Sequence, residues 1–346
     1  MRFTVDAYEL PLATPFRIAY DTVTTSHNLL VRAEADGLIG HGEAGPVPTI
    51  TGEDAAKTRT ALDAWLRTAP QIAPPCPEPR LGLAGSLAVE AASLDLAAQR
   101  DGVPLCQHLT GRAPRPLSTS ITIPIEDAPA AEARAAKHLA AGFRAFKVKT
   151  GAGLDDDLER VRVVRETVGG AEVRVDANQG WSLAEARRAA PVLADLGVDV
   201  LEQPLAKADL DGHRALVEDG VLPIMLDESV FSVADARRAL DAGAADRINI
   251  KLQKTGGIHE ALRIADLAQE AGVPCMIGCM IESRVAILAA AHVACAHDNI
   301  RWVDLDGHTF LAGDPVQGGA TIVEGRLDVG GRPGLGIDGV HPTVAA

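Results

Sequence analysis

A regular alternation of short apolar runs and alanine-rich segments constrains the fold of this chain more than any other feature. From about residue 117 onward, runs rich in β-branched residues recur roughly every 25 residues. The eight runs read STSITI, AFKVKT, EVRVDAN, VDVLEQP, PIMLDES, RINIKLQ, PCMIGCM and RWVDLD. Segments between them, such as AEARAAKHLAAG, have apolar residues at helical spacing. Eight strands alternating with helices predict an α/β fold, a (β/α) barrel in preference to an open doubly wound sheet.

The beginning of the chain has a different pattern. The runs RFTVDAYELPLA and NLLVRAEADGLIGHGEA alternate like strands of an antiparallel meander, and helical segments follow them. We therefore predict an α+β domain over residues 1–113 and a barrel domain over residues 114–315. The glycine-rich tail, about residues 316–346, has no helical pattern. We expect this tail to return and complete the first domain.

The composition limits the partners that the protein can have. The formal net charge of -14 argues against nucleic acid and anionic membranes, although solubility alone also explains it. No apolar run reaches the ~20 residues of a membrane helix, and the N-terminal sequence lacks the apolar segment of a signal peptide. We therefore expect a cytoplasmic protein. The five cysteines form no CxxC pair, which favours buried, reduced thiols over a zinc site.

Charged residues stand at the ends of six of the eight predicted strands. In a barrel, the working residues come from the carboxyl ends of the strands and the loops that follow. The charged ends are Lys147 with Lys149, then Asp176, Glu202, Asp227 with Glu228, Lys251, and Asp304 with Asp306. One charged strand end indicates little, but this series is hard to explain by solubility.

Three of these carboxylates are candidate metal ligands. Asp176, Glu202 and Asp227 end three neighbouring strands at equivalent depth, so their oxygens can converge on one cation. Carboxylates without histidine or cysteine favour Mg²⁺ over zinc. The alternative is a ring of independent salt bridges.

Lysine is rare in this chain, which makes its placement informative. Only seven of the 33 basic residues are lysines, and four of them lie in FKVKTG and NIKLQKTGG. In a ring of eight strands, Lys149 and Lys251 face each other from opposite sides. The neighbouring ammonium of Lys147 and a metal would both lower a lysine pKa toward the range of a base. Two opposed bases beside a metal that stabilises an enediolate predict proton removal from one face of an α-carbon and return on the other.

Several motifs resemble the enolase superfamily, specifically its muconate-lactonizing subgroup, over essentially the whole chain. They are KVK from Lys147, VDANQGW from Val175, LEQP from Leu201, LDES from Leu226 and NIKLQKTGG from Asn249. The resemblance implies an α+β capping domain and a modified (β/α)7β barrel. It also implies one Mg²⁺ per subunit on the three carboxylates, with Lys149 and Lys251 as acid/base catalysts. Relatives with this architecture are often oligomers, so it implies a homo-oligomer.

The resemblance also assigns supporting roles near the metal. Lys147 would assist Lys149 and lie near the substrate carboxylate. Three further residues would orient the ligands: Asn178, Glu228 and Lys254.

The stretch DLD in the last barrel strand resembles the Asp-x-Asp motif of dipeptide epimerases. In those enzymes the pair holds the free α-ammonium of the substrate, which would assign this role to Asp304 and Asp306. Two like charges on one face repel each other and become favourable when a cation lies between them. The stretch MIGCMIES is also similar to the dipeptide epimerases. It places Cys279 and Met280, with Thr122, around the carboxylate end of the pocket.

The capping-domain stretch TPFRIAYDTVTTSHN is expected to close over the barrel mouth and select the second side chain. Epimerases of L-Ala-D/L-Glu carry an arginine in this loop, whereas Asp21 takes that position here and Arg17 is nearby. An acidic residue predicts a neutral or cationic second residue rather than glutamate. The alternative is that Asp21 points to solvent.

The predicted function is therefore a Mg²⁺-dependent dipeptide epimerase that acts on the C-terminal residue of its substrate. One alternative is a racemase of N-acyl (N-succinyl) amino acids or a muconate-type cycloisomerase of the same superfamily. The other is a non-catalytic barrel that binds small molecules. In each case the partner is a small molecule, not a nucleic acid or a membrane.

Overall fold

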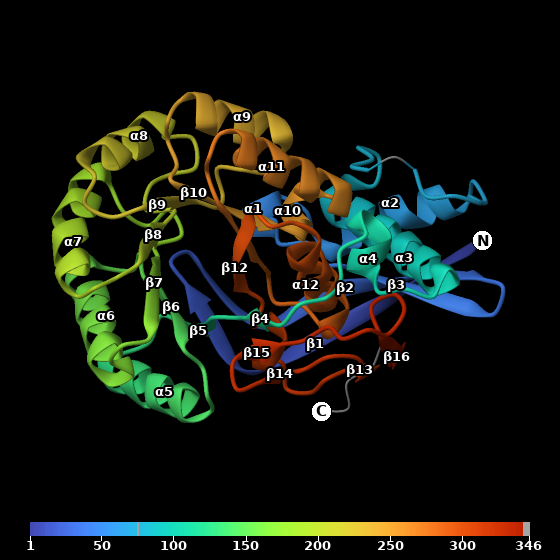
Figure 1. Ribbon diagram of the computed structural model, residues 1–346, viewed down its shortest axis with the longest axis horizontal. Helices are drawn as coiled ribbons and strands as arrows, with labels where there is room; N and C mark the ends of the chain where they lie inside the picture. Colours follow the sequence, from blue (N-terminus) through green and yellow to red (C-terminus); the bar gives the residue numbers. More distant parts are fainter. Residues whose placement is uncertain (75, 342–346) are drawn as a thin grey trace.

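The computed structural model describes residues 1–74 and 76–341, and it confirms the predicted α/β barrel (Figure 1). Eight parallel strands form one sheet in chain order. They are β5 (Ile121–Ile123), β6 (Ala145–Lys149), β7 (Glu172–Asp176), β8 (Val200–Glu202), β9 (Ile224–Leu226), β10 (Arg247–Lys251), β11 (Cys275–Gly278) and β12 (Ile300–Asp304). A parallel bridge between Thr119 and Val303 joins the start of β5 to β12 and closes the ring. All eight runs predicted as strands form strands.

Seven α-helices connect successive strands and surround the sheet on its outer side (Figure 1). They are α5 (Ala128–Ala140), α6 (Leu154–Val168), α7 (Leu183–Asp195), α8 (Leu210–Asp219), α9 (Val233–Asp241), α11 (Ile258–Glu270) and α12 (Arg284–Ala296), with a short α10 (Leu252–Thr255) before α11. The Ser182 hydroxyl accepts a hydrogen bond from the Glu185 amide at the start of α7, at 3.3 Å. Eight strands with seven connecting helices make a (β/α)7β barrel.

The capping unit precedes the barrel in the chain and lies beside it in Figure 1. Its antiparallel sheet consists of β1 (Arg2–Ile18), β2 (Asp21–Ala35) and β3 (Leu38–Ala44). Its helices are α1 (Pro48–Thr51), α2 (Ala55–Leu66), α3 (Gly82–Asp101) and α4 (Leu105–Thr110). The hairpin of β1 and β2 extends from this unit to the barrel.

The tail contacts both units rather than the first domain alone. It contains β13 (Val316–Gly318), β14 (Ile322–Val323), β15 (Arg326–Leu327) and β16 (Ile337–Val340), after a short 3-10 turn, η1 (Gly307–Phe310). Strand β15 pairs with β4 (Leu117–Ser118), next to the barrel. The Leu335 amide donates to Asp95 of α3 at 2.8 Å. Residues 342–346 of the tail lie outside the described residues, and the domain boundaries stay a prediction.

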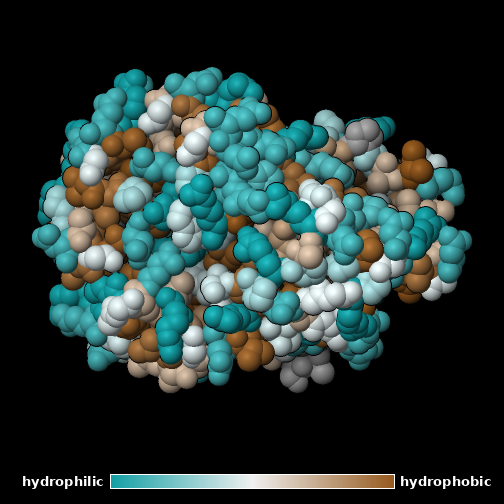
Figure 2. All heavy atoms as spheres, viewed as in Figure 1, coloured by the Kyte–Doolittle hydropathy of each residue, from teal (hydrophilic) through white to brown (hydrophobic). Residues whose placement is uncertain are grey.

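The apolar core of the barrel lies between the sheet and its helices. Phe146, Val148 and Val175 point outward from their strands and are fully buried there. Figure 2 shows polar residues over most of the visible surface, with apolar residues in small groups between them. Across the described ranges, no helix is both long and apolar enough to cross a membrane.

Strand β3 packs against α3 at a distance that only glycine permits. A Cβ on Gly42 would lie 1.9 Å from the Ala88 carbonyl oxygen, and one on Gly40 would lie 2.0 Å from the Ala92 carbonyl oxygen. Both oxygens belong to the backbone of α3, so they cannot rotate away. The close contact fixes the helix on the sheet of the capping unit.

Replacing Gly42 with alanine is expected to lower the free energy of unfolding by about 1–3 kcal/mol, because overpacking forces the backbone of α3 to shift. Gly170→Ala is the matched control, since nothing lies within 4 Å of the Cβ that it would gain. Urea denaturation followed by circular dichroism measures both variants. Equal stability of the two would show that α3 can move away from β3 without cost.

Candidate active site

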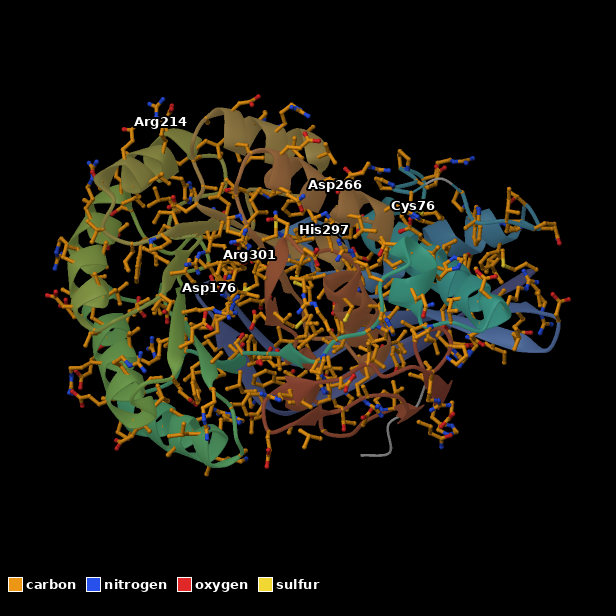
Figure 3. The ribbon with its side chains drawn as sticks, in the orientation of Figure 1. Cys76, Asp176, Arg214, Asp266, His297 and Arg301 are labelled. Carbon is orange, nitrogen blue, oxygen red and sulfur yellow. The ribbon has the colours of Figure 1, made fainter. Side chains whose placement is uncertain are left out.

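The inward faces of the barrel strands place the predicted charges side by side. Alternate residues of a strand share a face, so Lys147 and Lys149 of β6 both point into the barrel. The strand register sets Lys149 beside Asp176 of β7, and Asp176 beside Glu202 of β8. Asp227 follows β9, the next strand in the ring. Figure 3 shows Asp176 inside the ring of barrel helices.

The ammonium group of Lys147 is the centre of a buried charge cluster. Its Nζ lies 2.9 Å from Asp176 Oδ2 and 2.9 Å from Glu202 Oε1. It also donates to Asp304 Oδ2 at 3.0 Å. The side-chain amide of Asn249 donates to the same oxygen of Glu202 at 2.8 Å. Lys147 is 1% exposed, so water cannot replace these partners.

The two lysines predicted as catalysts enter the site from opposite sides. Lys149 Nζ donates to Asp176 Oδ2 at 2.7 Å and to Asn178 Oδ1 at 3.1 Å. Lys251 Nζ donates to Asp227 Oδ2 at 2.7 Å. Strands β6 and β10 lie four positions apart in the ring of eight. Groups on these strands can therefore act on opposite faces of a molecule held between them.

Without a metal, the protein's own charges raise the pKa values of Lys147 and Lys251, and the lowering expected beside a bound metal stays a prediction. Burial lowers the pKa of Lys251, but the surrounding carboxylates, with Asp227 foremost, together outweigh burial and hold it above the ordinary value. The pKa of Lys147 is also raised, because Asp176 and its neighbours outweigh burial. At Lys147 and Lys251 the carboxylates dominate among the described residues, so an added positive charge nearby would favour the neutral forms of these two lysines.

Asp176, Glu202 and Asp227 fit a divalent cation. Each offers one carboxylate oxygen, and these three oxygens lie within 4.8 Å of one another. Glu202 Oε2 is buried and accepts no hydrogen bond from the described residues. Burial and Asp176 together raise the pKa of Glu202 to about 8, so the lysines leave negative charge uncompensated there. A buried, all-oxygen donor set of this kind suits a hard cation.

The residues predicted to orient the ligands contact the cluster. The side-chain amide of Asn178 donates to Glu228 Oε1 at 3.0 Å. Lys254 Nζ lies 2.6 Å from Asp227 Oδ1 and donates to the Val230 carbonyl at 3.1 Å. Lys254 is fully buried, so its charge is fixed beside Asp227. Their orienting role stays a prediction.

Asp304 and Asp306 both face the interior, but they are not equivalent. Asp304 accepts hydrogen bonds from Lys147 and from the Ser120 hydroxyl, the latter at 2.5 Å. Asp306 accepts one from the Thr122 amide at 2.6 Å. Despite burial, Lys147 holds the pKa of Asp304 below its ordinary value, whereas burial and Asp304 raise the pKa of Asp306 to about 7. Lys147 therefore already relieves the predicted repulsion at Asp304, whereas Asp306 forms no ion pair with any cationic side chain that the structure describes.

One cavity of about 370 Å³ connects most of these residues. The predicted site residues that line it are Lys147, Lys149, Lys251, Asn178, Asp304, Asp306, Thr122, Cys279, Met280 and Asp21. The three metal-ligand candidates, with Glu228 and Lys254, are buried below this lining. The cavity therefore has a charged floor and walls that belong to both units.

The hairpin of β1 and β2 turns Asp21, not Arg17, toward this cavity. Asp21 pairs with Ile18 across the hairpin, and both line the cavity. Arg17 is exposed and is not among the described residues that line the cavity, although Thr22, its partner across the hairpin, does line it. Asp21 is partly exposed, and its role in selecting the second side chain stays a prediction.

Sequence reasoning missed two polar residues that hold the cluster. Ser120 bonds to Asp304, and Asn249 bonds to Glu202. Ser120 lies two positions before Thr122, and Asn249 lies two positions before Lys251. Each therefore shares the inward face of a predicted site residue. That spacing was a usable signal. No comparable signal marks Asp54, which lines the cavity from the N-cap of α2.

Known proteins share this architecture. The family model described as enolase C-terminal domain-like matches residues 130–340. The L-Lys-D/L-Arg epimerase of Methylococcus capsulatus is 41% identical over 346 residues, which cover 96% of each chain.

Two solved structures have closely similar folds. A substrate-liganded complex of the L-Ala-D/L-Glu epimerase from Bacillus subtilis has a TM-score of 0.93 and 36% identity, and the match covers 99% of each chain. The dipeptide epimerase from Methylococcus capsulatus, complexed with Mg and the dipeptide L-Arg-D-Lys, has a TM-score of 0.90 and 40% identity. That match covers 98% of this chain and 99% of the other.

Replacing Lys147 with methionine is expected to lower the free energy of unfolding by about 3–5 kcal/mol, because three buried carboxylates lose a shared cation. Lys137→Met is the control, since Lys137 of α5 is exposed. Urea denaturation in the presence of a chelator measures both variants. A Lys147→Met protein as stable as the control would mean that the carboxylates are compensated in another way.

Proposed function

This chain belongs to the enolase superfamily, and on that premise we propose that it is a magnesium-dependent dipeptide epimerase. The reaction is the inversion of the α-carbon of the C-terminal residue of a dipeptide. One observation carries the proposal: a single cavity is lined by the opposed Lys149 and Lys251 and also by the carboxylate pair Asp304 and Asp306. The first pair suits proton transfer, and the second suits a substrate with a free ammonium group.

Asp176, Glu202 and Asp227 would hold the magnesium ion. Two observations support this assignment: Glu202 Oε2 has no hydrogen-bond partner among residues 1–74 and 76–341, and all three carboxylates are buried. When bound, the ion would supply positive charge that stabilises the negative charge on the substrate carboxylate as the α-proton leaves.

Lys149 and Lys251 would exchange roles as base and acid. One lysine takes the α-proton from its side of the substrate, and the other donates a proton to the opposite side. The hydrogen bond of Lys149 Nζ to Asp176 and that of Lys251 Nζ to Asp227 hold the two ammonium groups apart. Inversion follows because the two protons travel on opposite faces of the same carbon.

Asp306 would bind the substrate ammonium, with Asp304 as its buried neighbour. Asp304 is already paired with Lys147, so the new ion pair forms chiefly with Asp306. The Thr122 amide fixes the Asp306 carboxyl group through the 2.6 Å hydrogen bond. An N-succinyl group or muconate is anionic at this end and would meet two carboxylates. This is why we favour a dipeptide over the substrates of the alternative racemase or cycloisomerase.

Asp21 would select a cationic or neutral side chain. Its carboxylate accepts hydrogen bonds from the Thr22 amide at 2.7 Å and from the Thr49 hydroxyl at 3.3 Å, both uncharged donors. Its negative charge is therefore left for the substrate. Asp54 also lines the cavity, but its carboxylate is already paired with Lys57 at 3.1 Å, so the selection rests on Asp21. A glutamate side chain would be repelled there.

Incubation of dipeptide pools in deuterated water with Mg²⁺ tests the reaction. One deuterium should enter the α-carbon of the C-terminal residue, and the configuration of that carbon should change. Mass spectrometry measures the deuterium, and proton NMR measures the configuration. Lys149→Ala should abolish exchange from one stereoisomer only, and Lys251→Ala from the other only, because each lysine serves one face. The control variant Lys137→Ala should still exchange the α-proton of both stereoisomers. Exchange on N-succinylamino acids alone would favour the racemase, and no exchange on any substrate would favour the non-catalytic barrel.

A substrate panel tests the side-chain preference. Ala-Lys and Ala-Arg should have higher kcat/KM values than Ala-Glu. Asp21→Asn should raise KM about fivefold for the cationic dipeptides, the size expected for a half-exposed ion pair, and leave that of Ala-Leu unchanged. A preference for Ala-Glu in the unmodified enzyme would refute the assignment of Asp21.

A further inference from the structure

The tip of the β1–β2 hairpin is anchored to the barrel on the side of Lys149. Ala19 packs against the loop after β6, since a Cβ on Gly151 would lie 2.9 Å from the Ala19 Cβ. The next residue, Tyr20, donates its hydroxyl hydrogen to Glu228 Oε1 at 3.2 Å. On the other side of the mouth, Ser26 at the base of the hairpin donates to the Ile281 carbonyl at 3.0 Å. The hairpin is therefore held at both sides of the cavity.

Glu228 connects Tyr20 to Lys149 through one further residue. Glu228 Oε1 also accepts the hydrogen bond from Asn178 Nδ2, at 3.0 Å, and Asn178 Oδ1 accepts from Lys149 Nζ, at 3.1 Å. The second oxygen of Glu228 is buried and has no hydrogen-bond partner among the described residues. Two donors on one oxygen thus fix this carboxylate, and the capping unit supplies one of them.

Asn178 has little freedom to move if one of the hydrogen bonds between Tyr20 and Lys149 is lost. Its φ of 41° places it in the left-handed region, and its backbone amide donates to Asp176 Oδ1 at 2.9 Å. The backbone is held, so the direction of the side chain depends on Glu228 and Lys149. A change at Glu228 therefore reaches the ammonium of Lys149 through the side chain of Asn178.

We propose that Tyr20 is a positioning residue for the reaction: it latches the hairpin over the barrel and, through Glu228 and Asn178, orients Lys149. The proposal rests on the proposed function, because it concerns one of the two proton-transfer groups. Tyr20 is not part of the cavity lining, so it acts through other residues and not by touching substrate. The hydrogen bonds of Lys251 do not include this series. The charge of Glu228 also acts through space on Lys251, but loss of the Tyr20 hydroxyl leaves that charge in place and changes only the hydrogen bonds that lead to Lys149, so we expect a one-sided effect.

The test is Tyr20→Phe, which removes one hydroxyl and keeps the ring. Tyr20 is 39% exposed, so the change leaves no cavity in a core. Deuterium exchange into each stereoisomer of one dipeptide is measured separately, and Lys149→Ala identifies the stereoisomer that Lys149 serves. For that stereoisomer we expect exchange to slow about tenfold, the effect of losing a hydrogen bond to a charged group. For the other stereoisomer the rate should change less than about twofold.

Ser26→Ala is the matched comparison, because it removes a hydroxyl that holds the same hairpin from the other side. It should slow both stereoisomers alike by loosening closure. Equal rates for Tyr20→Phe and the unmodified enzyme would overturn the proposal, and so would equal slowing of both stereoisomers. If the unmodified enzyme exchanges neither stereoisomer of any dipeptide, the proposed function has failed instead.

Discussion

Charge compensation inside the barrel is the constraint on which the site depends. Lys147 contacts Asp176, Glu202 and Asp304 in a place that water does not reach. Burying a charge without a partner costs several kcal/mol, so each strand end is tied to the charges of its neighbours. Within the described part of the chain, the arrangement still leaves one oxygen of Glu202 without a hydrogen-bond partner. The protein alone is therefore not fully compensated, which is the condition under which it would bind a cation and a cationic substrate.

The capping unit contributes to this site as more than a cover. Glu43 of β3 is buried and accepts hydrogen bonds from the Ser283 amide at 3.0 Å and from Asn28 at 2.7 Å. Ser283 is the N-cap of α12, where a carboxylate is favourable. This contact fixes the base of the hairpin, while Tyr20 fixes its tip. The walls of the cavity hold their positions only when the two units are docked.

Much of this could be predicted from the sequence, for a specific reason. Side chains along a strand point inward at every second residue, and the strands follow one another at a near-constant number of residues. Together these two regularities show which residues face the interior, so Asp176, Glu202 and Asp227 could be grouped without coordinates. Side-chain direction across units could not be predicted in this way. The pairing of Asp304 with Lys147 depends on closure of the ring, and the contact of Tyr20 with Glu228 depends on how the hairpin docks. The raised pKa values of Lys147 and Lys251 in the absence of a metal could not be predicted either, because they depend on how closely carboxylates from several strands surround each ammonium group.

The closure of the ring also has a consequence for the order in which the chain can fold. Ser120, before the first barrel strand, bonds to the Val303 carbonyl of the last one, 183 residues later. Asp304, a main partner of Lys147, lies on that last strand. During synthesis, Lys147 and the carboxylates of β7 to β9 emerge long before Asp304 does. The partly made barrel is then an open sheet with an unfinished charge cluster, and the native arrangement has to wait for the end of the chain.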